Sequence, residues 1–172
     1  MYNKALFLDR DGVINFDYGY VHRKEDFKFR PEIFNICKSA LKKNFKIIII
    51  TNQSGIGQNL FTERDFKLLN EFMISKFRLN QIEITHIYFC PYHPTKGRGK
   101  YLEDSYLRKP QPGMFFKASK EYSINLRKSI MIGDKKTDYE ASISANIKYF
   151  VDATRKNWER YSIKIINNTK DN

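Results

Sequence analysis

Short apolar runs alternate along this chain with longer segments of helical periodicity. Four runs are apolar at nearly every position and are followed by polar or glycine residues; they cover residues 5–8, 47–50, 87–89 and 130–132. Strands that are buried on both faces of a parallel sheet have this composition, because helices cover both faces. The pattern predicts four parallel strands, and a further apolar run at residues 163–166 predicts a late strand.

The segments between these runs have the 3.6-residue period of amphipathic helices. They cover residues 32–43, 62–77, 115–122 and 138–145. The second segment begins with Thr62 as a candidate N-cap and has Asp65 in the capping-box position. Alternating strands and helices indicate an α/β fold with a doubly wound, Rossmann-like parallel sheet.

The spacing of these elements predicts a single domain over residues 1–172. The gaps from Asp9 to Thr51 and from Thr51 to Lys109 are too short to hold a separate cap domain besides the predicted elements. Residues 91–112 contain four prolines and two glycines, so we expect an extended loop next to the strand ends. Residues 167–172 are expected to form a frayed tail.

Composition narrows the class of protein. Hydrophobic residues make up 41% of the chain, which is enough for a core and excludes complete disorder. No run is long and uncharged enough for a membrane-spanning helix, and the first residues reach charges too soon for a secretion signal. Two cysteines, Cys37 and Cys90, do not make a disulfide framework, so we expect a cytoplasmic protein.

The chain is strongly basic, with 31 Lys and Arg against 19 Asp and Glu and a net charge of +12. This charge is compatible with nucleic acid or an acidic membrane as a partner, and also with a small polyanionic substrate. The positive residues are scattered in short groups, as at Lys42-Lys43 and Lys135-Lys136, without a long basic block. A solvated lysine-rich surface accounts for many of them.

Polar residues stand where the predicted strands end. Asp9 and Asp11 follow the first strand, Thr51 follows the second, and Asp134 follows the last of the four, while Lys109 precedes the third helix. Ligands of open parallel sheets bind beyond the carboxyl ends of the strands. Crowded carboxylates require a cation, and oxygen ligands suit Mg²⁺, while an ammonium and a hydroxyl group beside them suit a phosphoryl group.

The order of these residues resembles the four motifs of the haloacid dehalogenase (HAD) superfamily. Motif I resembles residues 9–14, motif II resembles Thr51-Asn52, motif III resembles Lys109, and motif IV resembles residues 133–134 with Asp138. Longer segments resemble the D-glycero-D-manno-heptose-1,7-bisphosphate phosphatase family, whose close relatives are the histidinol-phosphate phosphatases. These segments are residues 7–14, 17–22, 51–56, 108–114 and 133–135, and residues 19–22 favour the heptose branch.

The resemblance implies a role for each motif residue. Asp9 would attack phosphorus to form an aspartyl phosphate, and Asp11 would protonate the leaving oxygen and then take a proton from water. Mg²⁺ would be held by Asp9, the backbone carbonyl of Asp11, and Asp134. Thr51 and Lys109 would hold the phosphoryl oxygens.

The rest of the substrate would be met by residues around this centre. The expected set is Asn52, Arg108, Asp17, Tyr20, Ser54 and Lys135. Asp138 has two interpretations that the sequence leaves open, because it could belong to the site or stabilise the start of a helix.

One feature of the family is incomplete in this chain. Many relatives carry a structural zinc in the pattern Cys-x-His…Cys-x-Cys before Arg-Lys-Pro, and the matching positions here are Cys90, Tyr92, Ser105 and Leu107. Cys90 is a zinc ligand type and His93 lies one step late, so a closed four-ligand site is not expected. Without zinc, residues 91–107 would need packing by Tyr92, Tyr101, Tyr106 and Leu107 or would stay mobile.

By resemblance, we expect a Mg²⁺-dependent phosphatase that removes the 7-phosphate of heptose 1,7-bisphosphate, for nucleotide-activated heptose and lipopolysaccharide or other surface glycans. A histidinol-phosphate phosphatase is the alternative enzyme. A weakly catalytic nucleic-acid-binding protein that uses the +12 charge is a third possibility, which intact Asp9 and Asp11 disfavour. The expected partner is therefore a small sugar bisphosphate rather than nucleic acid or a membrane, and the expected state is a monomer.

Overall fold

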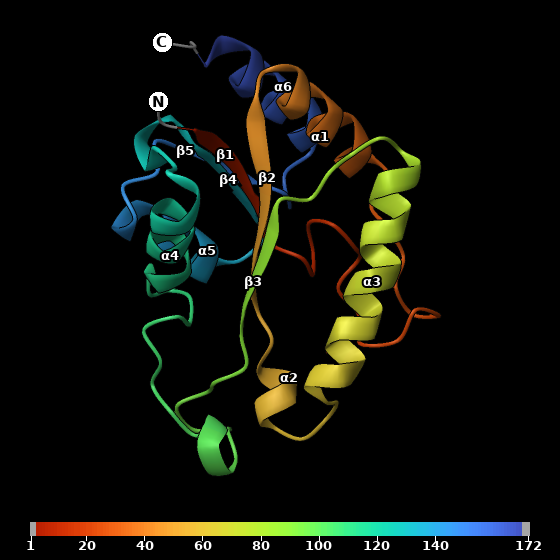
Figure 1. Cartoon of the computed structure of the whole chain (residues 1–172), viewed down its shortest axis with the longest axis vertical. Helices are drawn as coiled ribbons and strands as arrows, with labels where there is room; N and C mark the ends of the chain where they lie inside the picture. The colour runs from red at the N-terminus through yellow and green to blue at the C-terminus, as the bar shows by residue number, and fades with distance from the viewer. Residues whose placement is uncertain (1–2, 170–172) are drawn as a thin grey trace.

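The computed structural model describes residues 3–169, which form a five-stranded parallel sheet with helices on both faces (Figure 1). The strands are β1 (Lys4–Leu8), β2 (Phe45–Asn52), β3 (His86–Cys90), β4 (Ile130–Gly133) and β5 (Tyr149–Asp152). The helices are α1 (Glu32–Lys42), α2 (Ser54–Gly57), α3 (Glu63–Leu79), α4 (Gly113–Tyr122), α5 (Lys136–Ser144) and α6 (Trp158–Asn168). Short 3₁₀ turns lie at Gly99–Tyr101 and Leu126–Lys128.

The strand order is β3-β2-β1-β4-β5, with parallel pairing between all neighbours. The chain moves outward from β1 through β2 to β3 and then returns to place β4 on the other side of β1. The order therefore reverses between β1 and β4, and α/β sheets bind ligands outside the carboxyl ends of the strands at such a point. The topology places the end of β1 beside the end of β4.

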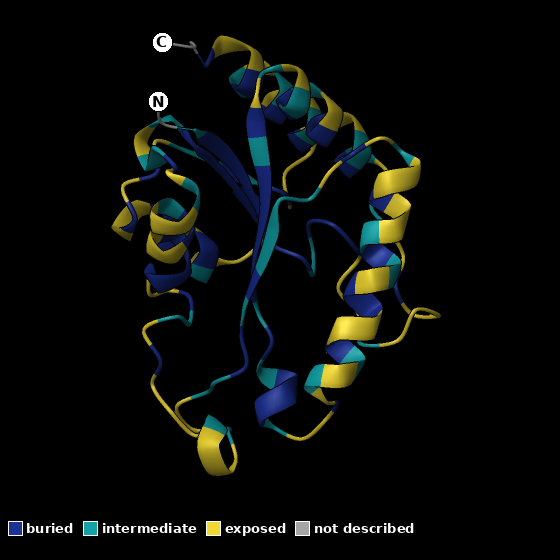
Figure 2. Ribbon diagram, viewed as in Figure 1, coloured by how far each residue is buried: buried dark blue, intermediate teal, exposed yellow. Residues whose placement is uncertain are grey.

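Successive residues of the central strands alternate between two hydrophobic clusters, as the strand geometry requires. Leu6 and Leu8 of β1 face the cluster that contains residues of α1, α3 and α6. Ala5 and Phe7 face the cluster that contains residues of α4 and α5. Because both faces are covered, the inner strands are buried along their length (Figure 2).

The structure confirms the four predicted strands and the four predicted helices, with boundaries that shift by a few residues. The predicted cap of α3 is also confirmed. The Asp65 backbone N–H donates to Thr62 Oγ1 at 3.1 Å, and the Thr62 backbone N–H donates to Asp65 Oδ2 at 2.8 Å. This reciprocal pair satisfies two donors at the start of the helix.

The predicted strand at residues 163–166 is wrong, because these residues lie within α6. Trp158, Ser162 and Ile166 are buried at a spacing of four residues, which is a helical face against α1 and the sheet. The fifth strand is instead β5, whose four residues follow α5. An apolar run of four residues cannot by itself distinguish a strand from one side of a buried helix.

The long loop between β3 and α4 is held against neighbouring elements. The Tyr101 hydroxyl donates to Glu63 Oε1 at 2.7 Å, and the Arg98 backbone N–H donates to the Gly57 carbonyl at 2.8 Å. Tyr92 and Leu107 pack against the cluster under α4. The expected packing is thus confirmed for these tyrosines and Leu107, whereas it is wrong for Tyr106, whose side chain is 57% exposed.

The predicted frayed tail divides between described and undescribed residues. Residues 167 and 168 form the end of α6, and the Thr169 hydroxyl donates to the Ile165 carbonyl at 2.9 Å. Residues 170–172 lie outside the described part of the chain. Among residues 3–169, the connections between strands contain no separate cap domain, and no helix is long and apolar enough to cross a membrane.

Helix α3 provides a matched test of this core. Phe77 is fully buried between α1 and the sheet, whereas Leu79, two residues later, is 77% exposed. We expect Phe77→Ala to lower the free energy of unfolding by about 3–5 kcal/mol, because a large cavity remains. Leu79→Ala should change it by less than about 0.5 kcal/mol. Urea denaturation of both variants measures this difference, and equal losses would contradict the assigned face of α3.

Candidate active site

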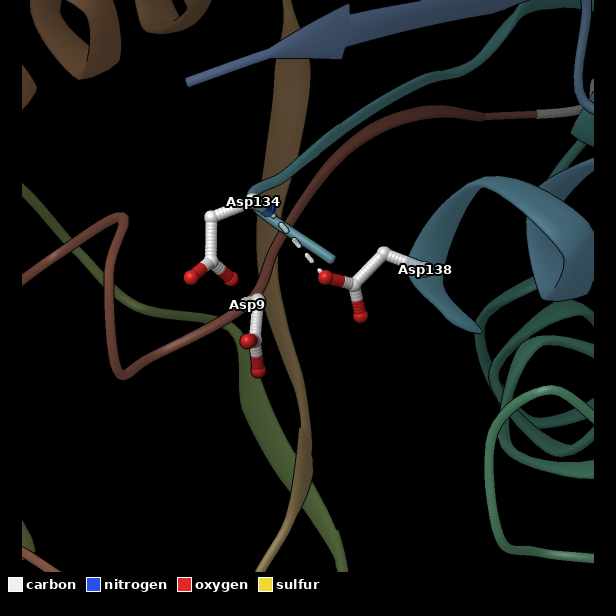
Figure 3. Close-up of side chains that lie close together, drawn as sticks. All are labelled: Asp9, Asp134 and Asp138. Atoms are coloured by element: carbon white, nitrogen blue, oxygen red, sulfur yellow. Dashed lines mark hydrogen bonds between the residues drawn. The ribbon is translucent and has the colours of Figure 1, made fainter. Parts of the chain in front are cut away.

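Three carboxylates meet at the point where the strand order reverses. Asp9 directly follows β1, Asp134 directly follows β4, and Asp138 lies in the first turn of α5. Their nearest oxygen atoms all lie within 4.8 Å of one another (Figure 3). One Asp138 oxygen accepts hydrogen bonds from the backbone N–H groups of Asp134 at 3.2 Å and Lys135 at 3.0 Å. Asp138 therefore has both predicted roles, since it caps the start of α5 and belongs to the cluster.

The Lys109 side chain also belongs to this cluster. Its ammonium lies 3.0 Å from Asp9 Oδ1 and 2.5 Å from Asp138 Oδ1, and it donates to the Ile50 carbonyl at 2.8 Å. The side chain is only 2% exposed. Its three donors thus meet oxygens from β1, β2 and α5, so a single buried ammonium connects three elements.

Burial and crowding change the proton affinities of these groups. Burial is the largest cause that raises the pKa of Asp9 to about 7; Lys109 opposes the rise, whereas Asp138, Asp134 and Asp11 add to it. Burial also raises the pKa of Asp134 to about 6. Burial alone would lower the pKa of Lys109, but Asp9 and Asp138 hold it above its ordinary value. The cluster carries more negative charge than one ammonium balances.

The donor set fits a small divalent cation. Asp134 Oδ1 is buried and has no hydrogen-bond donor among residues 3–169. A buried oxygen without a hydrogen-bond donor destabilises the folded state unless a further cation binds it. Carboxylate oxygens are the ligands that Mg²⁺ prefers, so Asp9 and Asp134 can hold this ion. The side chain of Asp11 is not part of the group.

The Asp11 carboxylate is held by a separate network. Arg10 Nη2 donates to it at 2.9 Å, and the amide groups of Asn15 and Gln53 each donate to it at 3.0 Å. Arg10 is fully buried, also donates to the Val21 carbonyl at 2.7 Å, and lies over the Phe66 ring. These donors fix the rotamer of Asp11 beside the centre.

Gln53 connects the predicted acid with the predicted phosphate clamp. Its side-chain amide donates to Asp11 Oδ2 at 3.0 Å and to Thr51 Oγ1 at 2.9 Å. Gln53 and Thr51 are both buried. Sequence reasoning missed Arg10 and Gln53, although both stand inside the quoted motifs. Each is a long polar residue beside motif residues at the end of a buried strand. This position could have indicated that its side chain bonds to the motif residues.

Two of the expected substrate residues support the loop that carries Lys109. Asn52 donates from its amide to the Lys109 carbonyl at 2.9 Å and accepts from the Lys109 backbone N–H at 3.1 Å. Arg108 donates to the Tyr92 carbonyl at 3.1 Å. The structure therefore gives the Asn52 amide a positioning function, because both of its polar atoms are bonded to the backbone of Lys109.

The other expected substrate residues surround the opening. The Lys135 ammonium lies 2.9 Å from Asp17 Oδ2, and Gln58 donates to the Tyr20 hydroxyl at 3.2 Å and to Ser54 Oγ at 3.3 Å. Burial alone would raise the pKa of Asp17, but hydrogen bonds from Lys135 and the Gly19 N–H hold it below its ordinary value. These polar groups are at the rim, where they can meet a substrate without entering the core.

The positions that match the family's zinc ligands lie near one another. Cys90 and Ser105 are both buried and in hydrogen-bond contact, which partly offsets the rise that burial gives to the pKa of the Cys90 thiol. His93 Nδ1 accepts from the backbone N–H groups of Thr95 at 3.2 Å and Lys96 at 3.1 Å. The histidine thus caps its own turn.

Comparison with known proteins places this site in a family. A family model described as polynucleotide kinase 3 phosphatase matches residues 7–156. The chain is 42% identical over 146 residues to D-glycero-beta-D-manno-heptose-1,7-bisphosphate 7-phosphatase of Haemophilus influenzae, covering 85% of this chain and 79% of that protein. It is 43% identical over 147 residues to the alpha-specific counterpart of Campylobacter jejuni, covering 86% and 80%.

Solved structures share the fold. A protein from Mesorhizobium loti described as a HAD-like phosphatase superposes with a TM-score of 0.87 at 27% identity, over 99% of this chain and 90% of that chain. The heptose bisphosphate phosphatase of B. bronchiseptica, solved with magnesium and phosphate, gives a TM-score of 0.75 at 24% identity, over 85% and 78%. The second likeness concerns the fold alone.

Gly12 tests the geometry of the carboxylate cluster. Its φ is +90°, and an added Cβ would lie 2.2 Å from Asp134 Oδ2. We expect Gly12→Ala to displace the Asp134 carboxylate and to lower kcat/KM by about 10²-fold or more, as misplaced catalytic groups do. Gly99→Ala is the control, since Gly99 also has a positive φ, of +53°, but open space around it. Equal phosphatase activity of the two variants would refute the close packing of Gly12 on Asp134.

The raised pKa of Asp9 predicts a pH-dependent stability in the absence of metal. Its ordinary value is 3.8, whereas the folded value is about 7, so the folded state binds more protons between these values. The free energy of unfolding should therefore fall as the pH rises from about 4 to about 7. Thermal unfolding in EDTA measures this, and Asp9→Asn should reduce the slope to the part that comes from Asp134, whose pKa is also raised, to about 6. The same slope in the variant would show that Asp9 is not the responsible group.

Proposed function

This chain belongs to the heptose-1,7-bisphosphate 7-phosphatase family of the HAD superfamily, and we propose that its reaction is removal of the 7-phosphate from D-glycero-D-manno-heptose 1,7-bisphosphate. The protein is a phosphatase, a phosphoric monoester hydrolase. The observation that carries the proposal is the buried Lys109 ammonium against Asp9, directly beside the orphaned oxygen of Asp134. This arrangement provides a nucleophile, a fixed positive charge and a place for a divalent cation.

In the first half of the reaction, an Asp9 oxygen attacks phosphorus in line with the bond to the sugar oxygen. The new bond makes an aspartyl phosphate, and the bond between phosphorus and the sugar oxygen breaks. Asp11 gives its proton to the leaving oxygen, so the sugar departs as an alcohol. The Thr51 hydroxyl and the Lys109 ammonium hold phosphoryl oxygens while charge develops on them.

In the second half, a water molecule attacks the same phosphorus. Asp11, now ionised, takes the proton of this water, and the bond between phosphorus and Asp9 breaks. Asp9 is regenerated and inorganic phosphate leaves. The bonds from Arg10, Asn15 and Gln53 keep the Asp11 carboxylate at one place for both proton transfers.

Mg²⁺ is the cofactor that we propose, held by Asp9, Asp134 and the backbone carbonyl of Asp11. When bound, it neutralises the carboxylates and the substrate phosphate so that one anion can approach another. The unbonded Asp134 Oδ1 and the raised pKa of Asp9 and Asp134 support a cation there. We propose no zinc, because Ser105 and Leu107 stand where the family pattern has cysteines.

The site is open, so rim residues would select the sugar. Asp17, Tyr20, Ser54, Arg108 and Lys135 are the candidates. Relatives of similar identity are named for the beta and the alpha anomer, and we therefore leave the preferred anomer to experiment. We also propose that the product enters nucleotide-activated heptose synthesis in the cytoplasm, in line with two free cysteines.

A substrate panel tests the proposed function. Phosphate release with Mg²⁺ should be fastest with one anomer of heptose 1,7-bisphosphate and slower with fructose bisphosphate and histidinol phosphate. A preference for histidinol phosphate would replace the heptose assignment. A preference for a 3′-phosphorylated oligonucleotide would show that the substrate is nucleic acid rather than a sugar phosphate.

Two lysines distinguish the site from the general positive charge. Lys109→Ala should lower kcat and raise KM together, with kcat/KM falling by about 10³-fold or more, because the ammonium binds the phosphoryl group before and during transfer. Lys42→Ala removes the same charge at the end of α1, just before β2 begins, whereas the site lies where β1 and β2 end. In steady-state kinetics, only Lys42→Ala should have the kcat and KM of the wild type. Similar losses of kcat/KM in both variants would contradict a site in which Lys109 has a specific position.

Metal analysis tests the absence of zinc. Protein purified without chelator should contain no stoichiometric zinc, and Mg²⁺ alone should restore activity after EDTA dialysis. Cys90→Ser should keep the melting temperature within about 4 °C of the wild type, which corresponds to roughly 1–2 kcal/mol or less for a chain of this length. One equivalent of tightly bound zinc, or collapse of the loop in Cys90→Ser, would show that a different ligand set binds the metal.

A further inference from the structure

A groove of about 1000 Å³ lies at the open edge of the sheet. Its lining includes Phe150 and Asp152 of β5, Tyr139 of α5 and Tyr161 of α6. β5 pairs with β4, and no described strand pairs with its other edge. Small-molecule sites occupy about 300–1,000 Å³, so the groove is large enough for a ligand of that class.

The groove borders the active site at the end of β4. Asp134 and Lys135 form part of its lining, and the same two residues stand at the end of β4 beside Asp9. The groove therefore lies next to the phosphoryl site on the α5–α6 side. The rim residues Tyr20, Ser54 and Arg108 do not line it.

Positive charge dominates this groove. Seven Lys and Arg side chains line it against two Asp side chains. Lys135, Lys136 and Arg155 have carboxylate partners. Within residues 3–169, no carboxylate lies within 4.0 Å of the side-chain nitrogens of Arg160 and Lys164. These two residues stand one turn apart on α6, where like charges repel. An anion bound between them would reduce this repulsion.

Exposed aromatic rings stand beside these charges. Tyr139 is 49% exposed and Tyr161 is 55% exposed. Trp158 forms part of the same wall, and its buried Nε1 has no hydrogen-bond acceptor among residues 3–169. A simple phosphate would use the cations and leave the rings in water. Rings interleaved with Lys and Arg instead suit a ligand that has both a planar base and phosphates.

We propose that this groove binds a nucleotide, with its base stacked on Tyr161 and its phosphates bound by Arg160 and Lys164. The nucleotide is either a free nucleoside polyphosphate or a unit of a single-stranded nucleic acid, since both present the same base and phosphates. The proposal adds a second ligand to the protein and does not depend on which sugar phosphate is hydrolysed. The competing explanation is that the lysines only discourage edge-to-edge pairing of β5.

Trp158 is the single tryptophan of the chain, so its fluorescence reports on the groove. We expect ADP and ATP, titrated in EDTA to prevent turnover, to change this signal with saturation below about 1 mM. Tripolyphosphate provides the charge without a base and should bind at least about tenfold more weakly than ATP. No saturable change with either nucleotide would overturn the proposal. Binding of tripolyphosphate as tight as that of ATP would also overturn it, because the base would then contribute nothing.

Variants separate the groove from the general basic surface. Arg160→Ala/Lys164→Ala and Tyr161→Ala should each raise the Kd for ATP about tenfold or more. Tyr161→Phe should bind like the wild type, because it keeps the ring. Lys42→Ala/Lys43→Ala removes the same charge at residues that do not line the groove, and it should bind normally. Equal weakening by both double variants would show non-specific attraction and would overturn the site.

Two further readouts locate the ligand and its source. Hydrolysis of the preferred sugar phosphate should be unchanged in Arg160→Ala/Lys164→Ala, so failure of nucleotide binding and failure of the phosphatase assignment are observed separately. A short single-stranded oligonucleotide that binds more tightly than ATP, and loses affinity in the same variants, identifies nucleic acid as the source. Tighter binding of ATP identifies a free nucleotide. Binding of both ligands without any effect of the groove variants would overturn the proposal.

Discussion

The ammonium of Lys109 is the interaction on which the rest of this structure depends. A charge with 2% exposure is stable only when every donor has a partner, because its water has been removed. Here the partners are Asp9 after β1, the Ile50 carbonyl in β2, and Asp138 at the start of α5. The same atom that can hold a phosphoryl oxygen therefore also fixes the relative positions of the three elements that form the site.

This constraint extends into the loop that carries the lysine. Asn52 bonds both polar groups of the Lys109 backbone, so the end of β2 sets where the ammonium can reach. The preceding loop is held by Tyr92 and Leu107 under α4 and by the bond from Tyr101 to Glu63. Packing against α4 and the hydrogen bond to α3 thus fix the loop that leads to Lys109.

A second network holds the Asp11 carboxylate and shares no hydrogen bond with the first. Arg10 is a fully buried cation that binds the Asp11 carboxylate, and Gln53 connects Asp11 with Thr51. The centre is therefore built from two layers, one in which Lys109 meets Asp9 and Asp138 and one in which Arg10 meets Asp11. Neither layer satisfies Asp134 Oδ1, so the remaining negative charge faces the place where metal and phosphate are expected.

The sequence by itself determined the fold class and the residues of the centre, because strand ends and motif spacing are local patterns. Asp9, Thr51 and Asp134 stand at the ends of short buried runs that are visible in the chain, and parallel packing then brings these ends together. Lys109 precedes the third predicted helix and was identified by its motif. Tertiary structure decided the rest. Residues 163–166 are helical because Trp158, Ser162 and Ile166, at a spacing of four residues, form a buried face of α6, which packs against α1. The burial of Arg10, the bridge made by Gln53 and the gathering of scattered positive residues around β5 depend on residues distant in sequence, and no local period records such contacts.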